Sequence, residues 1–169
     1  PANLSGLTHS TCYDVWLRSI CTVGDTSIWT GPFNFCTKCA SVADYCTDFE
    51  SDPTGSGTTP FCWTKYVNTT GNGYIQTNSS TFASNSGSNY VYFYTGSDAS
   101  ATLMLSAPAV SNLAAGTHRA NFWLRGDSTV IVGTMTDPAN PGTFTPWDTI
   151  APSSMSTSAY NNFKVNLTI

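Results

Sequence analysis

The sequence has few charged residues. Asp, Glu, Lys and Arg make up 9% of the 169 residues, whereas roughly 25% is usual in globular proteins. Ser, Thr, Asn and Gly take their place, and a polar, uncharged surface of this kind suits an extracellular protein with polar partners such as glycans. The six basic residues are scattered and the net charge is −4. This pattern excludes the basic footprint of a nucleic-acid-binding protein.

Long apolar runs are also missing. No run approaches the roughly 18 residues of a membrane-spanning helix, so we expect no membrane span. No signal peptide is recognisable, and because the chain begins at Pro1 we expect that a leader was either removed or not included. Helical periodicity is absent as well, which leaves strands and turns as the predicted secondary structure.

The sequence also lacks recognisable catalytic motifs. Glu50 is the single glutamate of the chain, whereas a glycosidase needs two carboxylates across a cleft. His9 and His118 have no partner at motif spacing, and no G-x-S-x-G sequence occurs. We therefore predict that the protein is not an enzyme.

Short β-rich runs separated by Gly, Ser, Asn and Pro turns fill the chain and predict an all-β, antiparallel fold. The best specified stretch is 117–135, in which the runs 119–124 and 129–135 flank an Arg-Gly-Asp-Ser link. We expect these two runs to form a hairpin near the middle of a sheet. The Arg-Gly-Asp tripeptide at 125–127 matches an integrin-type motif, and simple turn chemistry is the favoured explanation for it.

A second hairpin is expected near the start of the chain. The segment 12–21 alternates along its length, and a strand candidate at 28–36 follows a Gly-Asp-Thr-Ser loop. If the chain reverses near residues 23–27, Cys12 falls opposite Cys36, where a cross-strand disulfide is geometrically reasonable.

The cysteines predict an oxidising, extracellular compartment. They are even in number, lie within the first 62 residues, and are expected to form structural disulfides whose pairing the sequence leaves open. The C-x-x-C at 36–39 lacks the βαβ context of a redox site and the second ligand pair of a zinc site. The six disulfide candidates are Cys12, Cys21, Cys36, Cys39, Cys46 and Cys62.

The motif L-x-x-L-x-x-x-T-x-Y-x-V-x-x-R-x-x-C, followed by G-D-T-S-x-W-x-G-P-x-x-F, occupies residues 4–37. It resembles the last strands of a fibronectin type III domain, with Tyr13 as the corner tyrosine. The resemblance implies that the earlier strands of such a domain are missing. A lone hairpin is marginal in water, so residues 1–37 are expected either to belong to a truncated domain or to pack on something else.

Another series of motifs runs through residues 39–169: F-E-x-D, a polar loop, P-x-C-W, N-Y-V-Y-F-Y, A-T-L-M-L-S-A-P and F-T-P-W-D-T-I. Their order and spacing resemble the MAM-like jelly-roll domains called choice-of-anchor J, which occur in secreted multidomain proteins of bacteria. The resemblance implies an antiparallel jelly-roll β-sandwich over 38–169 that lacks its closing strands.

A structural calcium ion is the one cofactor expected. The resemblance places it on Glu50 and, less directly, on Asp52. Asp48, Glu50 and Asp52 also alternate along what reads as a strand edge, so their carboxylates could converge on one side, as a hard cation requires. A solvated acidic edge is the alternative.

Aromatic residues and sequons mark possible contacts with sugars. Exposed rings in strands could stack on sugar rings, although strand aromatics are more often part of a core; the candidates are Trp123, Trp147 and Tyr92. Four N-glycosylation sequons occur, of which the second and third are expected in loops: Asn3, Asn68, Asn78 and Asn166.

The sequence thus predicts a non-catalytic extracellular β-sandwich module with a structural or adhesive role. Its expected partners are copies of itself or neighbouring domains of the same chain, in a tandem array or in a filament completed by strand addition. The alternative is a carbohydrate-binding module that targets an attached hydrolase to glycans. A solvent-facing aromatic cluster would favour the alternative, and sheet edges buried against other copies would favour the first.

Overall fold

The computed structural model describes residues 3–167 and divides the chain into two compact units, Pro1–Ala40 and Ser41–Ile169. We call them the hairpin unit and the sandwich unit. The sequence predicted the boundary after residue 37. The described part of both units consists of strands and turns with three single-turn 3-10 helices, so the all-β class is confirmed. These helices are η1 (Leu113–Ala115), η2 (Pro141–Thr143) and η3 (Pro152–Ser154).

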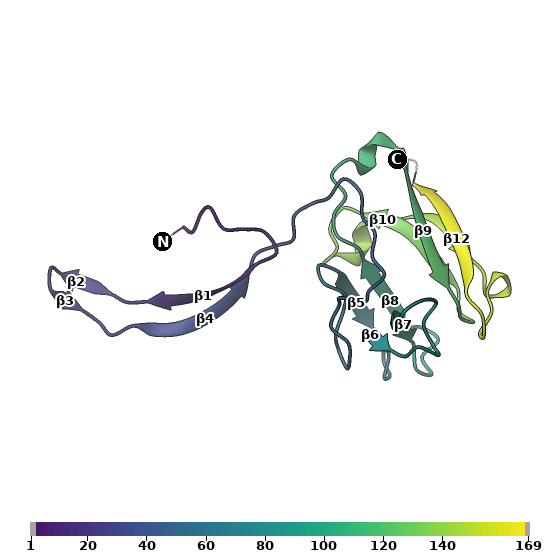
Figure 1. Ribbon diagram of the computed structural model, residues 1–169, viewed down its shortest axis with the longest axis horizontal. Helices are drawn as coiled ribbons and strands as arrows, with labels where there is room; N and C mark the ends of the chain where they lie inside the picture. The colour runs from purple at the N-terminus through teal and green to yellow at the C-terminus, as the bar shows by residue number, and fades with distance from the viewer. Residues whose placement is uncertain (1–2, 168–169) are drawn as a thin grey trace. The chain divides into compact units, whose positions relative to one another are not determined.

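The hairpin unit is a long antiparallel ribbon (Figure 1). Alternating side chains and a polar reversal produce this element, and its register sets Cys12 opposite Cys36, as the sequence predicted. The register shifts between Val15 and Leu17, and such a bulge locally twists a ribbon. The strands are β1 (Cys12–Leu17), β2 (Ile20–Thr22), β3 (Asp25–Thr26) and β4 (Thr30–Cys36).

The sandwich unit contains two successive sets of four strands (Figure 1). In each set the first strand pairs with the fourth and the second pairs with the third, and all four ladders are antiparallel. The first set is β5 (Thr64–Asn68), β6 (Tyr74–Ser79), β7 (Asn89–Tyr94) and β8 (Thr102–Ser106). The second set is β9 (His118–Leu124), β10 (Val130–Met135), β11 (Phe144–Ile150) and β12 (Asn161–Leu167).

In each set this nesting supplies two of the three pairings of a Greek key, and the third, between the first and second strands, is absent among the described strands. Among the described strands each ladder is two-stranded, and none joins the first set to the second. The antiparallel β-sandwich class therefore agrees with the structure, while the jelly-roll topology stays a prediction.

The prediction that residues 117–135 form a hairpin is wrong. Its two runs form strands, but β9 pairs with β12 and β10 pairs with β11. These distant partners offer apolar cross-strand pairs: Phe122 lies opposite Phe163, with ring centroids 6.2 Å apart, and Val130 lies opposite Ile150, which is 5% exposed. The Arg-Gly-Asp-Ser link is a connection between two ladders, and the Gly126 N–H donates to the Ser156 carbonyl.

The core of the described chain is small and lies in the sandwich unit. Ile75, Val165 and Ile150 are its buried hydrophobic residues, and Ile75 is fully buried. Thr77 is also fully buried, and its hydroxyl has no hydrogen-bond partner among the described residues. The buried hydrophobic side chains of the described chain are therefore few, and they lie on β6 of the first set and on β11 and β12 of the second.

Candidate functional site

The hairpin unit has no core of its own. None of its described residues is buried, although its strands and the connections between them carry large apolar side chains. We call this set the hairpin apolar surface; each member is more than half exposed: Trp16, Leu17, Ile20, Val23, Ile28, Trp29 and Phe33. A monomeric soluble protein rarely leaves so many large apolar side chains open, and such patches usually mark interaction surfaces.

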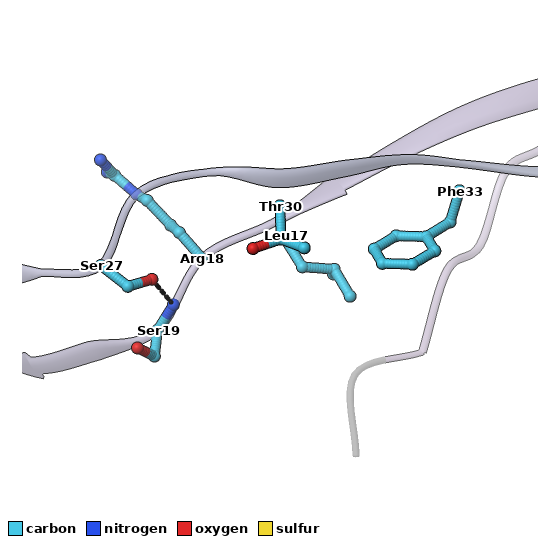
Figure 2. Close-up of a pocket in the computed structure, with 6 residues that line it drawn as sticks. All are labelled: Leu17, Arg18, Ser19, Ser27, Thr30 and Phe33. Atoms are coloured by element: carbon cyan, nitrogen blue, oxygen red, sulfur yellow. Dashed lines mark hydrogen bonds between the residues drawn. The ribbon is translucent and has the colours of Figure 1, made fainter.

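A shallow hollow of about 280 Å³ lies in the hairpin apolar surface and is shown in Figure 2. Leu17 and Phe33 supply its apolar lining, from β1 and β4. The Ser27 hydroxyl accepts from the Ser19 N–H at 2.9 Å and so fixes the backbone at one end. Arg18 also lines the hollow, and its guanidinium carbon lies 4.8 Å from the Trp29 ring centroid. The hollow can therefore accept an apolar side chain from a partner, with polar groups at one end.

Open strand edges are the second feature suited to association. Each described strand forms a ladder with one partner, so its other edge has no ladder. On β6 part of that edge is covered, because Gly55 and Thr58 exchange backbone hydrogen bonds with Thr77. Unpaired strand edges are ready sites for the addition of another strand.

Four cysteines are disulfide-bonded and two are not. Cys12 pairs with Cys36, as predicted, and Cys39 and Cys62 are also disulfide-bonded. The prediction that all six cysteines pair is wrong for Cys21 and Cys46, which are free and exposed. For Cys21 the reason is local: it lies on β2, and the opposing strand β3 consists of Asp and Thr.

The acidic residues expected to bind calcium lie in a turn instead of along a strand edge. The Glu50 carboxylate accepts from the backbone N–H groups of Asn89 at 2.7 Å and Ser88 at 2.8 Å, and from the Ser88 hydroxyl. These bonds, that to Asn89 foremost, hold the pKa of Glu50 below its usual value. Asp48 accepts from the N–H of Glu50, and Asp52 accepts from the N–H of Phe61.

Each of the three carboxylates thus organises a different piece of backbone. In the described part of the chain, no three His, Cys, Asp or Glu side chains form a group that could hold a metal ion. The arrangement gives the expected calcium ion no convergent carboxylate set, and the calcium site stays a prediction.

Asp98 is a polar centre that the sequence did not reveal. One of its carboxylate oxygens accepts from the N–H and hydroxyl of Thr70 and from the hydroxyl of Thr69; the other accepts from the N–H and hydroxyl of Ser100. These bonds, led by the Ser100 hydroxyl, hold the pKa of Asp98 far below its usual range. The carboxylate ties the end of β5 to the loop before β8. A Gly-Ser-Asp-Ala-Ser sequence signalled a turn there, but not its distant partner.

The three predicted stacking residues lie on three different ladders. Trp123 of β9 is 53% exposed, and Trp147 of β11 is half-buried with its indole N–H donating to the Thr134 hydroxyl at 3.0 Å. Tyr92 of β7 belongs to a cluster with Tyr94 of the same strand and Tyr74 of β6. Tyr74 was not among the residues predicted from the sequence. Tyr74 lies directly opposite Tyr94 in the ladder, a pairing that only the register reveals.

The sequons lie at varied positions. Asn68 ends β5 and Asn78 lies within β6, so the expectation that both lie in loops is wrong. Asn3 and Asn166 are exposed, and Asn78 is half-buried and accepts from the Gln76 amide. The third residue of the Asn166 sequon, at position 168, is outside the described residues.

In the part of the chain that the structure describes, no helix has the length and apolar character needed to cross a membrane. Comparison with protein-family models, with curated proteins and with solved structures finds no match for this chain. The resemblances to fibronectin type III and MAM-like domains therefore rest on the motifs alone.

Proposed function

We propose that this protein is a non-catalytic, extracellular structural or adhesive module that associates with other copies of itself through its hairpin unit. The observation that carries the proposal is the hairpin apolar surface, whose seven large side chains are more than half exposed on a ribbon without a buried residue. A two-stranded ribbon alone is marginally stable in water, and burial of these side chains against a partner would stabilise it.

A second copy of the chain is the partner we favour because each copy carries both halves of the contact. The hairpin unit offers an apolar ribbon, and the sandwich unit offers strands with an open edge. Strand addition supplies main-chain hydrogen bonds, and a side chain of the accepting sandwich unit that enters the hollow of the hairpin apolar surface would give specificity. When the donating and accepting surfaces differ, as here, the contact repeats head to tail and generates rings or filaments.

Charge does not oppose this contact. In the hairpin unit Arg18 and Lys38 balance Asp14 and Asp25, so the net charge of −4 lies on the sandwich unit. A ribbon without net charge meets no net like-charge barrier at an acidic partner. Strands β1 and β4 carry no Lys, but Asp14, Pro32 and the bulge between Val15 and Leu17 interrupt their edges, so the apolar side chains are the main basis of the proposed contact.

The extracellular location is part of the proposal. Four disulfide-bonded cysteines suit an oxidising compartment, and the low content of charge suits a polar environment outside the cell. The sequon asparagines Asn3, Asn68 and Asn166 are exposed and so available for glycans in such a compartment.

The test is light scattering of the full chain after size-exclusion chromatography, with Leu17→Ser and Phe33→Ser combined. Both side chains are more than half exposed and line the hollow, so their loss should remove association while the disulfide-linked hairpin persists. Phe82→Ser is the matched control, because Phe82 is 98% exposed, lies outside the hairpin apolar surface and, being between β6 and β7, belongs to no strand edge. Association that survives the double substitution, or that the control abolishes equally, would refute the proposed surface.

A further inference from the structure

The β6–β7 ladder carries a cluster of three tyrosine rings on one face. We call Tyr74, Tyr92 and Tyr94 the tyrosine face. The ring centroids lie 5.3 Å apart for Tyr74 and Tyr94, 5.9 Å for Tyr74 and Tyr92, and 6.2 Å for Tyr92 and Tyr94. The three side chains are 36%, 38% and 41% exposed in sequence order. Three aromatic rings are thus held together by the register of one ladder and remain open to solvent.

The opposite face of the same ladder is partly buried. Ile75 and Thr77 alternate with the tyrosine face along β6 and are both fully buried. Phe93 of β7, which lies opposite Ile75 in the ladder, is 45% exposed, so this side is closed along β6 and open along part of β7. The tyrosine face is therefore distinguished by three polar aromatic rings in mutual contact, and not by exposure alone.

Polar and charged groups surround the rings. Among the described residues, no hydrogen bond is made by the hydroxyls of Tyr74, Tyr92 and Tyr94. Gln76, which lies opposite Tyr92 in the ladder, is half-buried; its amide N–H donates to Asn78 and its amide oxygen accepts from the Gly57 N–H. Two charged groups lie nearby: the Lys65 ammonium donates to the carbonyl oxygen of Ile75, and Asp127, in the link between β9 and β10, acts on Tyr92. Burial first, then Tyr74, Tyr94, Tyr90 and Asp127, raise the pKa of Tyr92, so its hydroxyl remains a neutral donor.

We propose that the tyrosine face is a binding site for a neutral carbohydrate chain. Aromatic rings match the apolar C–H faces of pyranose rings, while the tyrosine hydroxyls match sugar hydroxyls. The ring centroids lie between 5.3 and 6.2 Å apart, so the three rings form one contiguous aromatic patch. The Lys65 ammonium is held by the carbonyl oxygens of Gly57 and Ile75, and the negative net charge of the chain disfavours anionic glycans.

A neutral glycan is favoured over a second copy of the chain at this face. An interface between proteins gains most from aliphatic and aromatic side chains with few unpaired polar atoms. Here each ring carries a hydroxyl that has no partner among the described residues. A dry protein surface would leave these hydroxyls unsatisfied, whereas a sugar would pair with them. The proposal uses other groups than self-association does, because the tyrosine face is a face of the β6–β7 ladder, whereas self-association uses the hairpin apolar surface and strand edges.

The test is native affinity electrophoresis of the full chain in gels that contain mixed-linkage β-glucan, galactomannan, xylan or dextran, with dextran sulfate as the anionic counterpart of dextran. We expect retardation by at least one neutral polysaccharide and none by dextran sulfate. Removal of one ring should weaken binding about tenfold, so Tyr92→Ala should raise the Kd by this factor and Tyr74→Ala with Tyr92→Ala should abolish retardation.

Two further variants separate the contribution of ring stacking from that of the hydroxyl, and the tyrosine face from other exposed rings. Tyr92→Phe keeps the ring and removes the hydroxyl, so it should retain most of the affinity if stacking dominates. Trp123→Ala removes an exposed ring from a different ladder and should bind as the parent does. Thermal unfolding confirms that each variant is folded.

The proposal is overturned if no neutral polysaccharide retards the chain, or if the folded Tyr74→Ala, Tyr92→Ala variant binds as the parent does. It is also overturned if Tyr92→Ala changes the association state without changing retardation, because the face would then be a protein interface.

Discussion

The disulfide between Cys12 and Cys36 should determine whether the hairpin unit is ordered at all. None of the described residues of the hairpin unit is buried, so its ladders and the disulfide bonds of Cys12, Cys36 and Cys39 are its main constraints, and the bond between Cys12 and Cys36 is the one that joins β1 to β4. We expect the Cys12→Ser, Cys36→Ser variant to lose the ladder of β1 and β4 in the dilute monomer. The sandwich unit should keep its fold, because its core side chains belong to other strands.

The free energy by which this disulfide stabilises the ribbon follows from the length of the loop that it closes. The two cysteines are 24 residues apart in sequence. In the chain-entropy model, a cross-link of this span removes enough freedom from the open chain to stabilise the closed ribbon by about 3.5 kcal/mol. This corresponds to a roughly 300-fold larger population of the open ribbon once the cross-link is removed.

Hydrogen exchange measured by mass spectrometry on peptides reports this population directly. Amides of residues 12–36 should exchange roughly 300-fold faster in the double variant, up to the rate of an unstructured chain. Amides of β6 around Ile75 should be unchanged. Cys21→Ser is the matched control, because Cys21 carries a free thiol in the same unit.

Two results would refute this reasoning. Exchange within a few-fold of the parent over residues 12–36 would mean that the hairpin unit has stabilising contacts besides its ladder and disulfide. Equal acceleration around Ile75 would mean that the two units unfold together, contrary to the separate core of the sandwich unit.

Three further predictions concern the sandwich unit, the acidic groups and the thiols. Ile75→Ala should lower the stability of the sandwich unit by about 2–5 kcal/mol, measured by denaturant unfolding; a loss below about 1 kcal/mol would contradict its place in the core. Glu50 and Asp98 have lowered pKa values, so their stabilisation is present above their usual pKa values, near 4.5 and 3.8, and is lost as pH falls further. Asp98→Asn should therefore lower the Tm at pH 7 and flatten its decline between pH 4 and 2, and an unchanged profile would count against the hydrogen bonds described. Iodoacetamide should modify Cys21 and Cys46 in the native protein, as peptide mapping would show, and modification of Cys12 or Cys36 without reduction would contradict the disulfide.

The sequence predicted those parts of the fold that depend on local pattern. Alternation and a short reversal were enough to place Cys12 opposite Cys36, because in a hairpin the turn sets the register. The same local pattern gave a wrong prediction for residues 117–135, because the two adjacent runs pair with other strands and not with each other. The apolar residues that pair with them, Phe163 and Ile150, are distant in sequence, and their preference emerges only in the folded chain.

The candidate sites depended even more on long-range structure. The alternation of Asp48, Glu50 and Asp52 suggested a strand edge, but Phe49 adopts a positive φ of 65° in a turn, which sends the three carboxylates to different backbone donors. Tyr92 was predicted to stack on sugars, but its neighbour Tyr74 was not, because their proximity is a consequence of the β6–β7 register. Composition showed that the chain is rich in aromatics, and the ladder determined which of them cluster.

The most direct test of self-association through the hairpin unit is sedimentation velocity of the native full chain over a wide range of concentration, with negative-stain imaging of the same samples. The account predicts species that grow with concentration and appear as repeating filaments or rings. A single monomeric species at every concentration would contradict it, and the hairpin apolar surface would then need a partner other than a second copy of this chain.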